Sequence, residues 1–253
     1  MNYTKFRLEG KFAHFRQPSA NNAALTYVVP PKSALVGLLG AVCGWDRRVL
    51  NPLYPLLCEH LRYGVALNSS PRKNTLAYST HSFHYSTFNG APEQTIIGSA
   101  RTRRYAVRSL GSQEYLRDVS YDVVVAVPAT AAGEALALFT EFTAQVRAGQ
   151  AVFLPVLGSQ NCPARLTFLG SGQLREEGLD TEEFSTRGFL DTFKYEPDTY
   201  ASNVLIEQLP TRLLGDRFTD LMSMKRVYVK PGGSLRGIGK HQVDGNGECW
   251  TLI

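Results

Sequence analysis

The sequence lacks the common signatures of nucleotide-hydrolysing, dinucleotide-dependent and serine-nucleophile enzymes. It contains no G-x-x-x-x-G-K-[ST] phosphate loop, no G-x-G-x-x-G fingerprint and no G-x-S-x-G elbow. Its four cysteines, Cys43, Cys58, Cys162 and Cys249, form no C-x-x-C pair. Their spacing therefore supports neither a zinc site nor a disulfide framework. We expect four reduced thiols in a cytoplasmic protein, with no metal and no cofactor.

Long apolar runs are also missing. The longest uncharged apolar stretch, residues 34–45, has twelve residues, whereas a membrane-spanning helix needs about 20. The first residues contain no apolar core of a secretory signal. Hydrophobic residues make up 43% of the chain and charged residues 19%, which is typical of a folded globular protein and not of a disordered one. We expect a soluble protein with no membrane partner.

Charge of one sign is concentrated in each half of the chain. Residues 1–120 contain 15 Lys and Arg against 6 Asp and Glu, a formal charge of +9, and residues 121–253 contain 12 against 16, a formal charge of −4. This polarity indicates a polyanion-binding face in the first half. A solvated basic surface without a partner is the alternative, and charge alone does not separate the two.

Period-two and helical patterns occur in the first 67 residues. Residues 4–16 alternate as a strand, with Phe6 and Leu8 on one face, and the alternation slips by one residue before Ala13, which predicts a bulge near Gly10. A helix begins after the Pro-Pro pair, at Lys32, and its apolar residues recur at helical spacing. Its first N–H groups and partial positive charge would suit an anion. Residues 49–62 predict a second helix and residues 62–67 a strand.

Residues 69–117 have a different character. This segment is rich in Ser, Thr, Asn and Gly and has seven cations against two carboxylates, with aromatic residues between them. We interpret it as a long β-hairpin that projects from the body, with its turn near Asn89-Gly90. Arginine binds phosphate bidentately, and aromatic faces stack on unpaired bases. The segment therefore predicts an interface for single-stranded RNA.

The second half completes an α+β pattern. Residues 119–127 predict a strand, residues from 128 onward a helix that ends at Gly149, and residues 152–156 and 164–168 further strands. Without the hairpin, the order of elements is that of a ferredoxin-like βαββαβ fold. Residues 174–220 are acidic and irregular. We therefore expect a ferredoxin-like domain, residues 1–173, with a hairpin at about 69–117, and a C-terminal extension, residues 174–253, packed on the same domain.

Four stretches of the sequence match the pattern of a known family. Residues 10–16 read GKFAHFR, residues 26–44 read TYVVPPKSALVGLLGAVCG, residues 114–121 read EYLRDVSY and residues 157–164 read LGSQNCPA. In this order they resemble the CRISPR-associated Cas-five family of the RAMP superfamily. The resemblance covers about residues 4–168, and the Pro-Pro-Lys-Ser entry to the first helix is most similar to the type I-B or I-A branches.

The resemblance implies a subunit of a type I Cascade surveillance complex. Such a subunit has a ferredoxin-like "palm" and a β-hairpin "thumb", and it binds the 5′ handle of the CRISPR RNA without cutting it. It caps the filament of backbone subunits and contacts the large subunit, which recognises target DNA in antiviral defence. On this basis we expect RNA contacts from the palm and thumb residues Arg16, Lys32, Arg72, Lys73, Phe83, Tyr85, Arg101, Arg103, Arg104, Tyr105 and Arg108.

Two other functions remain open at this point. The first is a metal-independent endoribonuclease that cleaves CRISPR repeat RNA, with His81 or His84 and Tyr85 as acid and base. One family branch, in type I-C systems, cleaves the repeat in this way, but it has an adjacent Lys-His pair in its hairpin. Here the adjacent pair is Lys240-His241, near the end of the chain. The second is a structural adaptor whose basic face meets an acidic protein.

Overall fold

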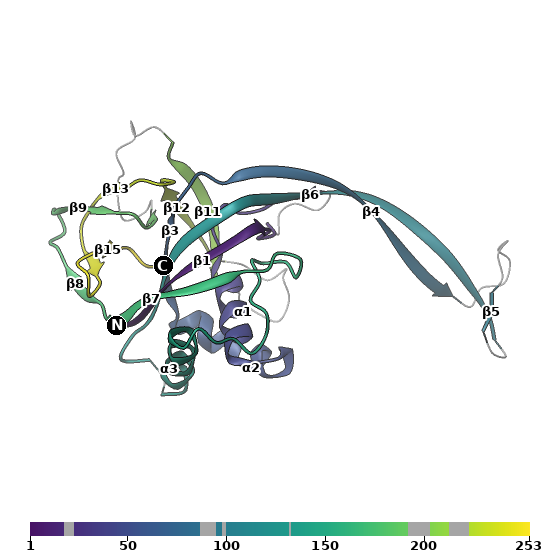
Figure 1. The fold of residues 1–253 in the computed structure, drawn as a ribbon, viewed down its shortest axis with the longest axis horizontal. Helices are drawn as coiled ribbons and strands as arrows, with labels where there is room; N and C mark the ends of the chain where they lie inside the picture. Colours follow the sequence, from purple (N-terminus) through teal and green to yellow (C-terminus); the bar gives the residue numbers. More distant parts are fainter. Residues whose placement is uncertain (18–22, 87–94, 98–99, 132, 192–202, 213–222) are drawn as a thin grey trace.

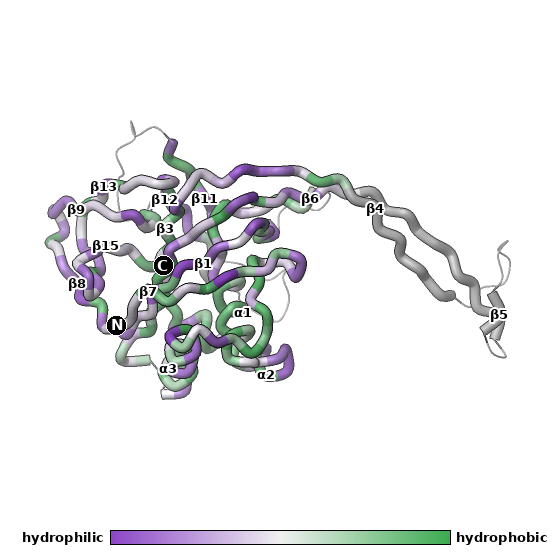
Figure 2. The backbone as a smooth tube through the Cα atoms, viewed as in Figure 1, coloured by the Kyte–Doolittle hydropathy of each residue, from purple (hydrophilic) through white to green (hydrophobic). Residues whose placement is uncertain are grey.

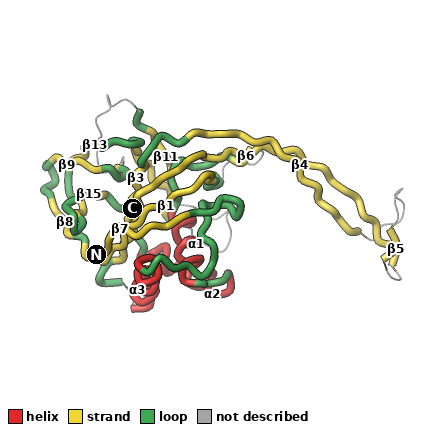
Figure 3. The backbone as a smooth tube through the Cα atoms, in the orientation of Figure 1, coloured by secondary structure: helices red, strands yellow, loops and turns green. Residues whose placement is uncertain are grey.

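The computed structural model describes residues 1–253 except 18–22, 87–94, 98–99, 132, 192–202 and 213–222. Side chains are also outside the description at residues 23, 78–110, 211–212 and 223. The described part is a mixed α+β fold in which strands predominate (Figure 3). Its three helices are α1 (Lys32–Cys43), α2 (Arg47–His60) and α3 (Gly133–Arg147).

The central sheet is built around β1 (Asn2–Ala13). This strand pairs antiparallel with β6 (Ala100–Val127) on one side and with β7 (Arg165–Gln173) on the other. Beyond β6 lies β3 (Arg62–Leu67), also antiparallel, and the short β2 (Ala23–Ala24) runs parallel to β6. The order across the sheet is therefore β7–β1–β6–β3, with the N-terminus at one end of the inner strand β1 (Figure 1).

The three helices cover one face of this sheet and enclose the main core (Figure 1). Phe6 of β1 meets Phe142 of α3 edge to face, with ring centroids 5.8 Å apart. Val123 and Val125 of β6 point to the same side and are fully buried with Leu39 of α1. Figure 2 shows this apolar character along α1 and the inner part of α3. Within residues 4–8 and 119–127, every second residue is buried on the side of the helices, so the apolar alternation of these stretches predicted the two strands from the sequence.

The opposite face of the sheet is partly covered by the C-terminal residues. Trp250 lies on Tyr3, Val124 and Ala126, and this small second core is distinct from the helical one. The Lys5 ammonium donates to Asp244 Oδ2 at 3.1 Å and to Glu248 Oε2 at 2.6 Å, and it lies 5.2 Å from the Trp250 ring centroid. The end of the chain is thus fastened to its first strand.

Two small sheets make up these C-terminal residues. One contains β10 (Leu190–Asp191), β12 (Ser223–Val229) and β11 (Leu205–Arg212). The other contains β13 (Leu235–Ile238), β9 (Glu183–Thr186), β15 (Cys249–Trp250), β14 (His241–Val243) and β8 (Arg175–Glu177). The prediction that residues 174–220 are irregular is therefore wrong for the four strands that start there. These strands have two to eight residues, and β8 and β9 carry exposed acidic residues, so they show little apolar periodicity.

A long antiparallel ribbon leaves the sheet where β3 ends. Strand β4 (Arg72–Ser86) pairs with residues 103–117 of β6 in one continuous register, and β5 (Thr95–Ile97) pairs with β6 farther out. Figure 1 shows the ribbon projecting from the body. The expected turn at Asn89-Gly90 lies outside the described residues.

One expected strand is wrong. Residues 152–156 form a loop, in which Val152 and Phe153 donate backbone hydrogen bonds to the carbonyls of Val42 and Ala41 at the end of α1. The side chains of Val152 and Leu154 are 62% and 68% exposed. The apolar sequence here lies on the surface and does not enter a sheet, so hydrophobicity alone misassigned it.

Candidate nucleic-acid interface

Four separate sequence segments meet at the root of the ribbon. The His14 amide donates to the carbonyl of Leu157 at 3.0 Å, and the Tyr27 amide donates to the carbonyl of Phe15 at 2.9 Å. The His14 Nδ1 lies 2.7 Å from the carbonyl oxygen of Glu114. These contacts join the stretches 10–16, 26–44, 114–121 and 157–164, so the motifs that are scattered in the sequence form one structural unit.

Tyr115 lies at the centre of this unit. Its hydroxyl accepts a hydrogen bond from Asn161 Nδ2 at 3.0 Å, and its ring packs against His14 and Phe12, with centroid distances of 5.6 and 6.2 Å. Gly158, at φ 82°, lies so close to the His14 carbonyl that no Cβ fits there. The loop 157–163 can therefore follow the end of β1 only because this position is glycine.

His14 is a structural residue at neutral pH. Burial lowers its pKa, the hydrogen bond to the Glu114 carbonyl acts in the opposite direction, and the charge of Arg16 lowers it further. The ring is consequently neutral near pH 7, and its Nδ1 carries the proton that it donates to the carbonyl of Glu114. It fixes the strand β6 to β1 and supplies no positive charge for a phosphate.

Two carboxylates order the segment that leads into α1. Glu114 Oε2 accepts from the Thr26 amide at 3.1 Å and from Lys73 Nζ at 3.3 Å. Glu207 Oε1 accepts from the Val28 amide at 3.1 Å, and burial raises the pKa of Glu207. Both carboxylates accept from backbone amides, so Glu114 holds residue 26 against the ribbon and Glu207 holds residue 28 against β11.

Of the predicted RNA contacts, three lie at the root of the ribbon and are exposed. Arg16 follows β1 and pairs with Thr26 in an isolated bridge. Arg72 and Lys73 begin β4, and the Lys73 ammonium is shared with Glu114. The structure therefore brings Arg16, Arg72 and Lys73 together around the motif segments, on the side from which the ribbon projects.

Lys32 lies elsewhere. It is 4% exposed, and its ammonium donates to the carbonyl of Cys58 at 3.3 Å, at the end of α2. Burial lowers its pKa to about 8, and the charges of Arg62 and Lys225 act in the same direction. The start of α1 is thus enclosed by the protein, so we leave Lys32 out of the contacts proposed below.

The other predicted contacts are on the outer ribbon, where the structure describes backbone pairing and no side chains. The register places Tyr85 opposite Arg104, and His81 and His84 opposite Arg108 and Tyr105. His81 and His84 are three residues apart in one strand and so belong to opposite faces of the ribbon. The predicted contacts whose side chains are outside the description are Phe83, Tyr85, Arg101, Arg103, Arg104, Tyr105 and Arg108.

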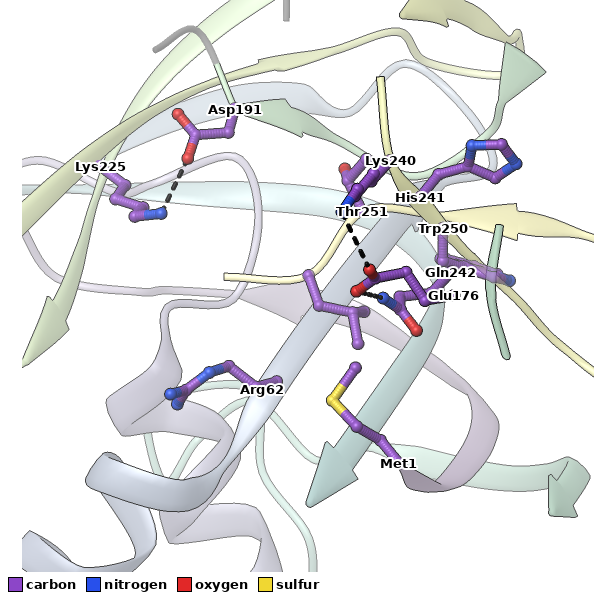
Figure 4. A pocket seen from close by; sticks show the side chains of 11 residues that line it. Met1, Arg62, Glu176, Asp191, Lys225, Lys240, His241, Gln242, Trp250 and Thr251 are labelled. Atoms are coloured by element: carbon purple, nitrogen blue, oxygen red, sulfur yellow. Dashed lines mark hydrogen bonds and ion pairs between the residues drawn. The ribbon is translucent and has the colours of Figure 1, made fainter. Parts of the chain in front are cut away.

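A polar pocket of about 200 Å³ lies between the body and the C-terminal sheets (Figure 4). Several of its charges are already paired. Lys225 Nζ is 2.8 Å from Asp191 Oδ2, and Lys240 Nζ is 3.8 Å from Glu176 Oε1. Gln242 Nε2 also donates to Glu176, at 3.3 Å. Because these charges are paired within the protein, the pocket is better suited to holding the C-terminal sheets in place than to binding a polyanion.

The described ranges contain neither a metal-binding cluster nor a membrane-spanning helix. No cluster of three or more His, Cys, Asp or Glu side chains in these ranges is arranged to hold a metal ion. Among the same residues, no helix combines the length and the apolar character needed to cross a bilayer.

Residues 3–219 match the family model described as CRISPR-associated protein (Cas_Cas5). The chain belongs to this CRISPR-associated family. The match to the Cas-five family extends beyond the motif segments, which end at residue 164, into the acidic residues after β7. No curated protein matches the sequence.

Solved structures share the fold of this Cas-five chain at low sequence identity. A chain titled "CRISPR RNA-guided surveillance complex" is 16% identical with a TM-score of 0.52, over 94% of this chain and 91% of that one. A CRISPR protein from Archaeoglobus fulgidus is 10% identical with a TM-score of 0.53, over 100% of this chain and 99% of that one. Each match covers more than nine-tenths of both chains, so the fold is shared beyond the central sheet.

Two exposed residues near the root were not among the predicted contacts. They are Phe12, which continues the apolar alternation of Phe6 and Leu8 in the sequence, and its neighbour Lys11. The slip in alternation before Ala13 is the signal that could have identified them, because a slip turns the side chain before it away from the core.

Proposed function

We propose that this protein is a non-catalytic RNA-binding subunit of a type I Cascade surveillance complex, and that it binds the 5′ handle of the CRISPR RNA. The observation that carries the proposal is the convergence of the four family motifs at the root of a long ribbon, beside exposed Arg16, Arg72 and Lys73. Family membership supports the same function.

We interpret the central sheet as a ferredoxin-like palm and the β4–β6 ribbon as the thumb. In support, the order β7–β1–β6–β3 is antiparallel throughout and one face carries all three described helices, as a βαββαβ chain requires. Strand β6 extends from the ribbon into the sheet, so the thumb and the palm share one strand.

Phosphate contacts would come from two levels of the thumb. At the root, Arg16, Arg72 and Lys73 are exposed. Farther out, Arg101, Arg103, Arg104 and Arg108 follow one another on β6, with Phe83, Tyr85 and Tyr105 paired nearby. Guanidinium groups bind the phosphates of RNA whatever the base sequence, and aromatic rings stack on the bases. Such a surface would bind a single strand of RNA along its length.

The partners follow from this position. The subunit would cap the filament of backbone subunits at the handle end, meet the large subunit, and reach target DNA through the complex. The C-terminal residues expose five carboxylates, those of Glu176, Glu177, Asp180, Glu182 and Glu183. This acidic surface would repel RNA and is suited to a protein contact.

The endoribonuclease remains the alternative function. It needs His81 or His84 with Tyr85 near one scissile phosphate, and the register places the two histidines three residues apart on one strand. End-labelled repeat RNA incubated with the protein in EDTA separates the two functions. We expect a shifted band on a native gel and intact RNA on a denaturing gel. A discrete product that is lost in the His81→Ala, His84→Ala double variant would make the protein the processing enzyme.

A further inference from the structure

An exposed aromatic ring lies on the open part of the palm. The alternation of β6 changes at Asp118, which takes a left-handed φ of 54°. Val119 and Leu116 are three residues apart, yet both are buried in the helical core. Strand β1 changes its alternation at the same place: the pairs Gly10–Val119 and Phe12–Arg117 flank Lys11 and Asp118, which form no pair in the strand register. The change turns Phe12 out of the core.

Phe12 therefore belongs to the face opposite the helices. Its neighbour Ala13 and the paired Leu116 are fully buried on the helical side, and successive strand residues alternate between faces. Trp250 covers this outer face only near Tyr3 and Val124. Phe12 lies beyond that cover, is 36% exposed, and has one edge fixed against Tyr115.

Three cations are neighbours of Phe12 in the chain or in the sheet register. Arg117 and Arg72 share its row, since Phe12 pairs with Arg117 and Arg117 pairs with Arg72. Lys11 Nζ lies 2.6 Å from Asp118 Oδ1, and Arg117 Nε lies 3.5 Å from Asp118 Oδ2. The charges of Lys11, Arg117 and Arg72 all lower the pKa of Asp118, so one carboxylate serves three cations.

We propose that Phe12 is a stacking platform for one base of a single-stranded RNA, with Arg117, Arg72 and Lys11 on the adjoining phosphates. This inference rests on the proposed function and names a subsite within it. A planar apolar ring next to exposed cations matches a nucleotide, because each nucleotide presents the flat face of its base and a charged phosphate close to it. An apolar protein surface would match the ring and leave the surplus positive charge without partners.

The test is a double-mutant cycle between Phe12→Leu and the RNA. Handle RNAs, each with a single abasic nucleotide, are titrated against wild type and variant. We expect Phe12→Leu to weaken binding of intact RNA about ten-fold. At one abasic position, and at that one alone, wild type and variant should bind equally, because the base that stacks is already missing. The abasic scan of the wild type is informative even if the variant folds poorly.

The salt dependence of RNA binding distinguishes the contribution of the Phe12 ring from that of the charged side chains. Phe12→Leu removes no charge, so the slope of log K against log salt should stay unchanged, whereas Arg117→Gln should make it shallower by about 0.7. The control is Val49→Ala, an exposed apolar residue on α2, which should not affect RNA binding. Equal affinity of Phe12→Leu and wild type for intact RNA, or an equal loss on every abasic RNA, would overturn the stacking subsite. Failure of the wild type to bind any handle RNA would instead refute the proposed function.

Discussion

The Lys5 ammonium lies 3.1 Å from Asp244 Oδ2 and joins the first strand to a turn near the end of the chain. Both side chains are almost completely buried. Burial alone raises the pKa of Asp244, but backbone hydrogen bonds from Asn246 and Glu248 and the Lys5 ammonium outweigh it, and the net pKa is lowered. The charged pair therefore holds the turn between β14 and β15 on the central sheet.

Asp244→Asn should destabilise the protein by about 3 kcal/mol, because it leaves a buried ammonium with only one carboxylate. Glu248→Gln is the matched control. Its carboxylate is 41% exposed, so its loss should cost less than about 1 kcal/mol. Urea unfolding measures both. A carboxylate with a lowered folded-state pKa stabilises above its unfolded pKa and loses this effect as the pH falls, so the difference between wild type and Asp244→Asn should shrink below about pH 4. Equal stability of the two variants at pH 7 would contradict this account.

Lys32→Met should stabilise the protein at pH 7 and leave RNA affinity unchanged. The folded-state pKa of Lys32 is about 8, below the unfolded value of about 10.4. Between these values the unfolded chain binds more protons, so wild-type stability rises with pH as Lys32 loses its proton. The advantage of Lys32→Met over wild type should therefore disappear by about pH 10. Lys73→Met replaces an exposed lysine and should give no such gain in stability at pH 7 in urea unfolding. A clear loss of RNA affinity in Lys32→Met would restore Lys32 to the interface.

Gly158→Ala should cost about 3 kcal/mol, since a Cβ at this position meets the His14 backbone in addition to the strain of a positive φ. Gly149 provides the control. It has a φ of 67° and open space around it, so Gly149→Ala should cost only about 1 kcal/mol. Thermal or urea unfolding gives both values. Equal costs would mean that the loop 157–163 moves away from β1 with ease.

Periodicity was enough to predict β1, α1 and the inner half of β6, because each buries one face against a layer of the opposite type. It failed for Val152 and Leu154, whose apolar side chains lie on a loop that is held by hydrogen bonds to α1. At the site, composition indicated that Arg101, Arg103, Arg104 and Arg108 belong to the ribbon, where the register places them; their contacts with RNA stay a prediction. Composition did not reveal that Lys32 is enclosed or that Phe12 is turned outward, because both depend on contacts between distant segments.

Reversal of Arg101, Arg103 and Arg104 to Glu should abolish measurable RNA binding at physiological salt and leave the melting temperature unchanged. Three lost phosphate contacts would make the salt dependence shallower by about 2 in log–log slope. Reversal of Arg47, Arg48 and Arg236, which are exposed on other elements, changes the net charge by the same amount and should reduce affinity much less. Similar losses in the two triple variants would show that net charge, and not the thumb, governs binding.

The central claim is that the protein recognises the 5′ handle, and a competition experiment tests it most directly. Labelled CRISPR RNA bound to the protein is challenged with unlabelled RNA that carries the handle, with the same RNA lacking it, and with RNA in which the handle has been moved to the 3′ end. Handle-binding predicts that the first competitor displaces the label at least about ten-fold more effectively than the other two. Equal displacement by all three would contradict the account and leave only a general affinity for single strands.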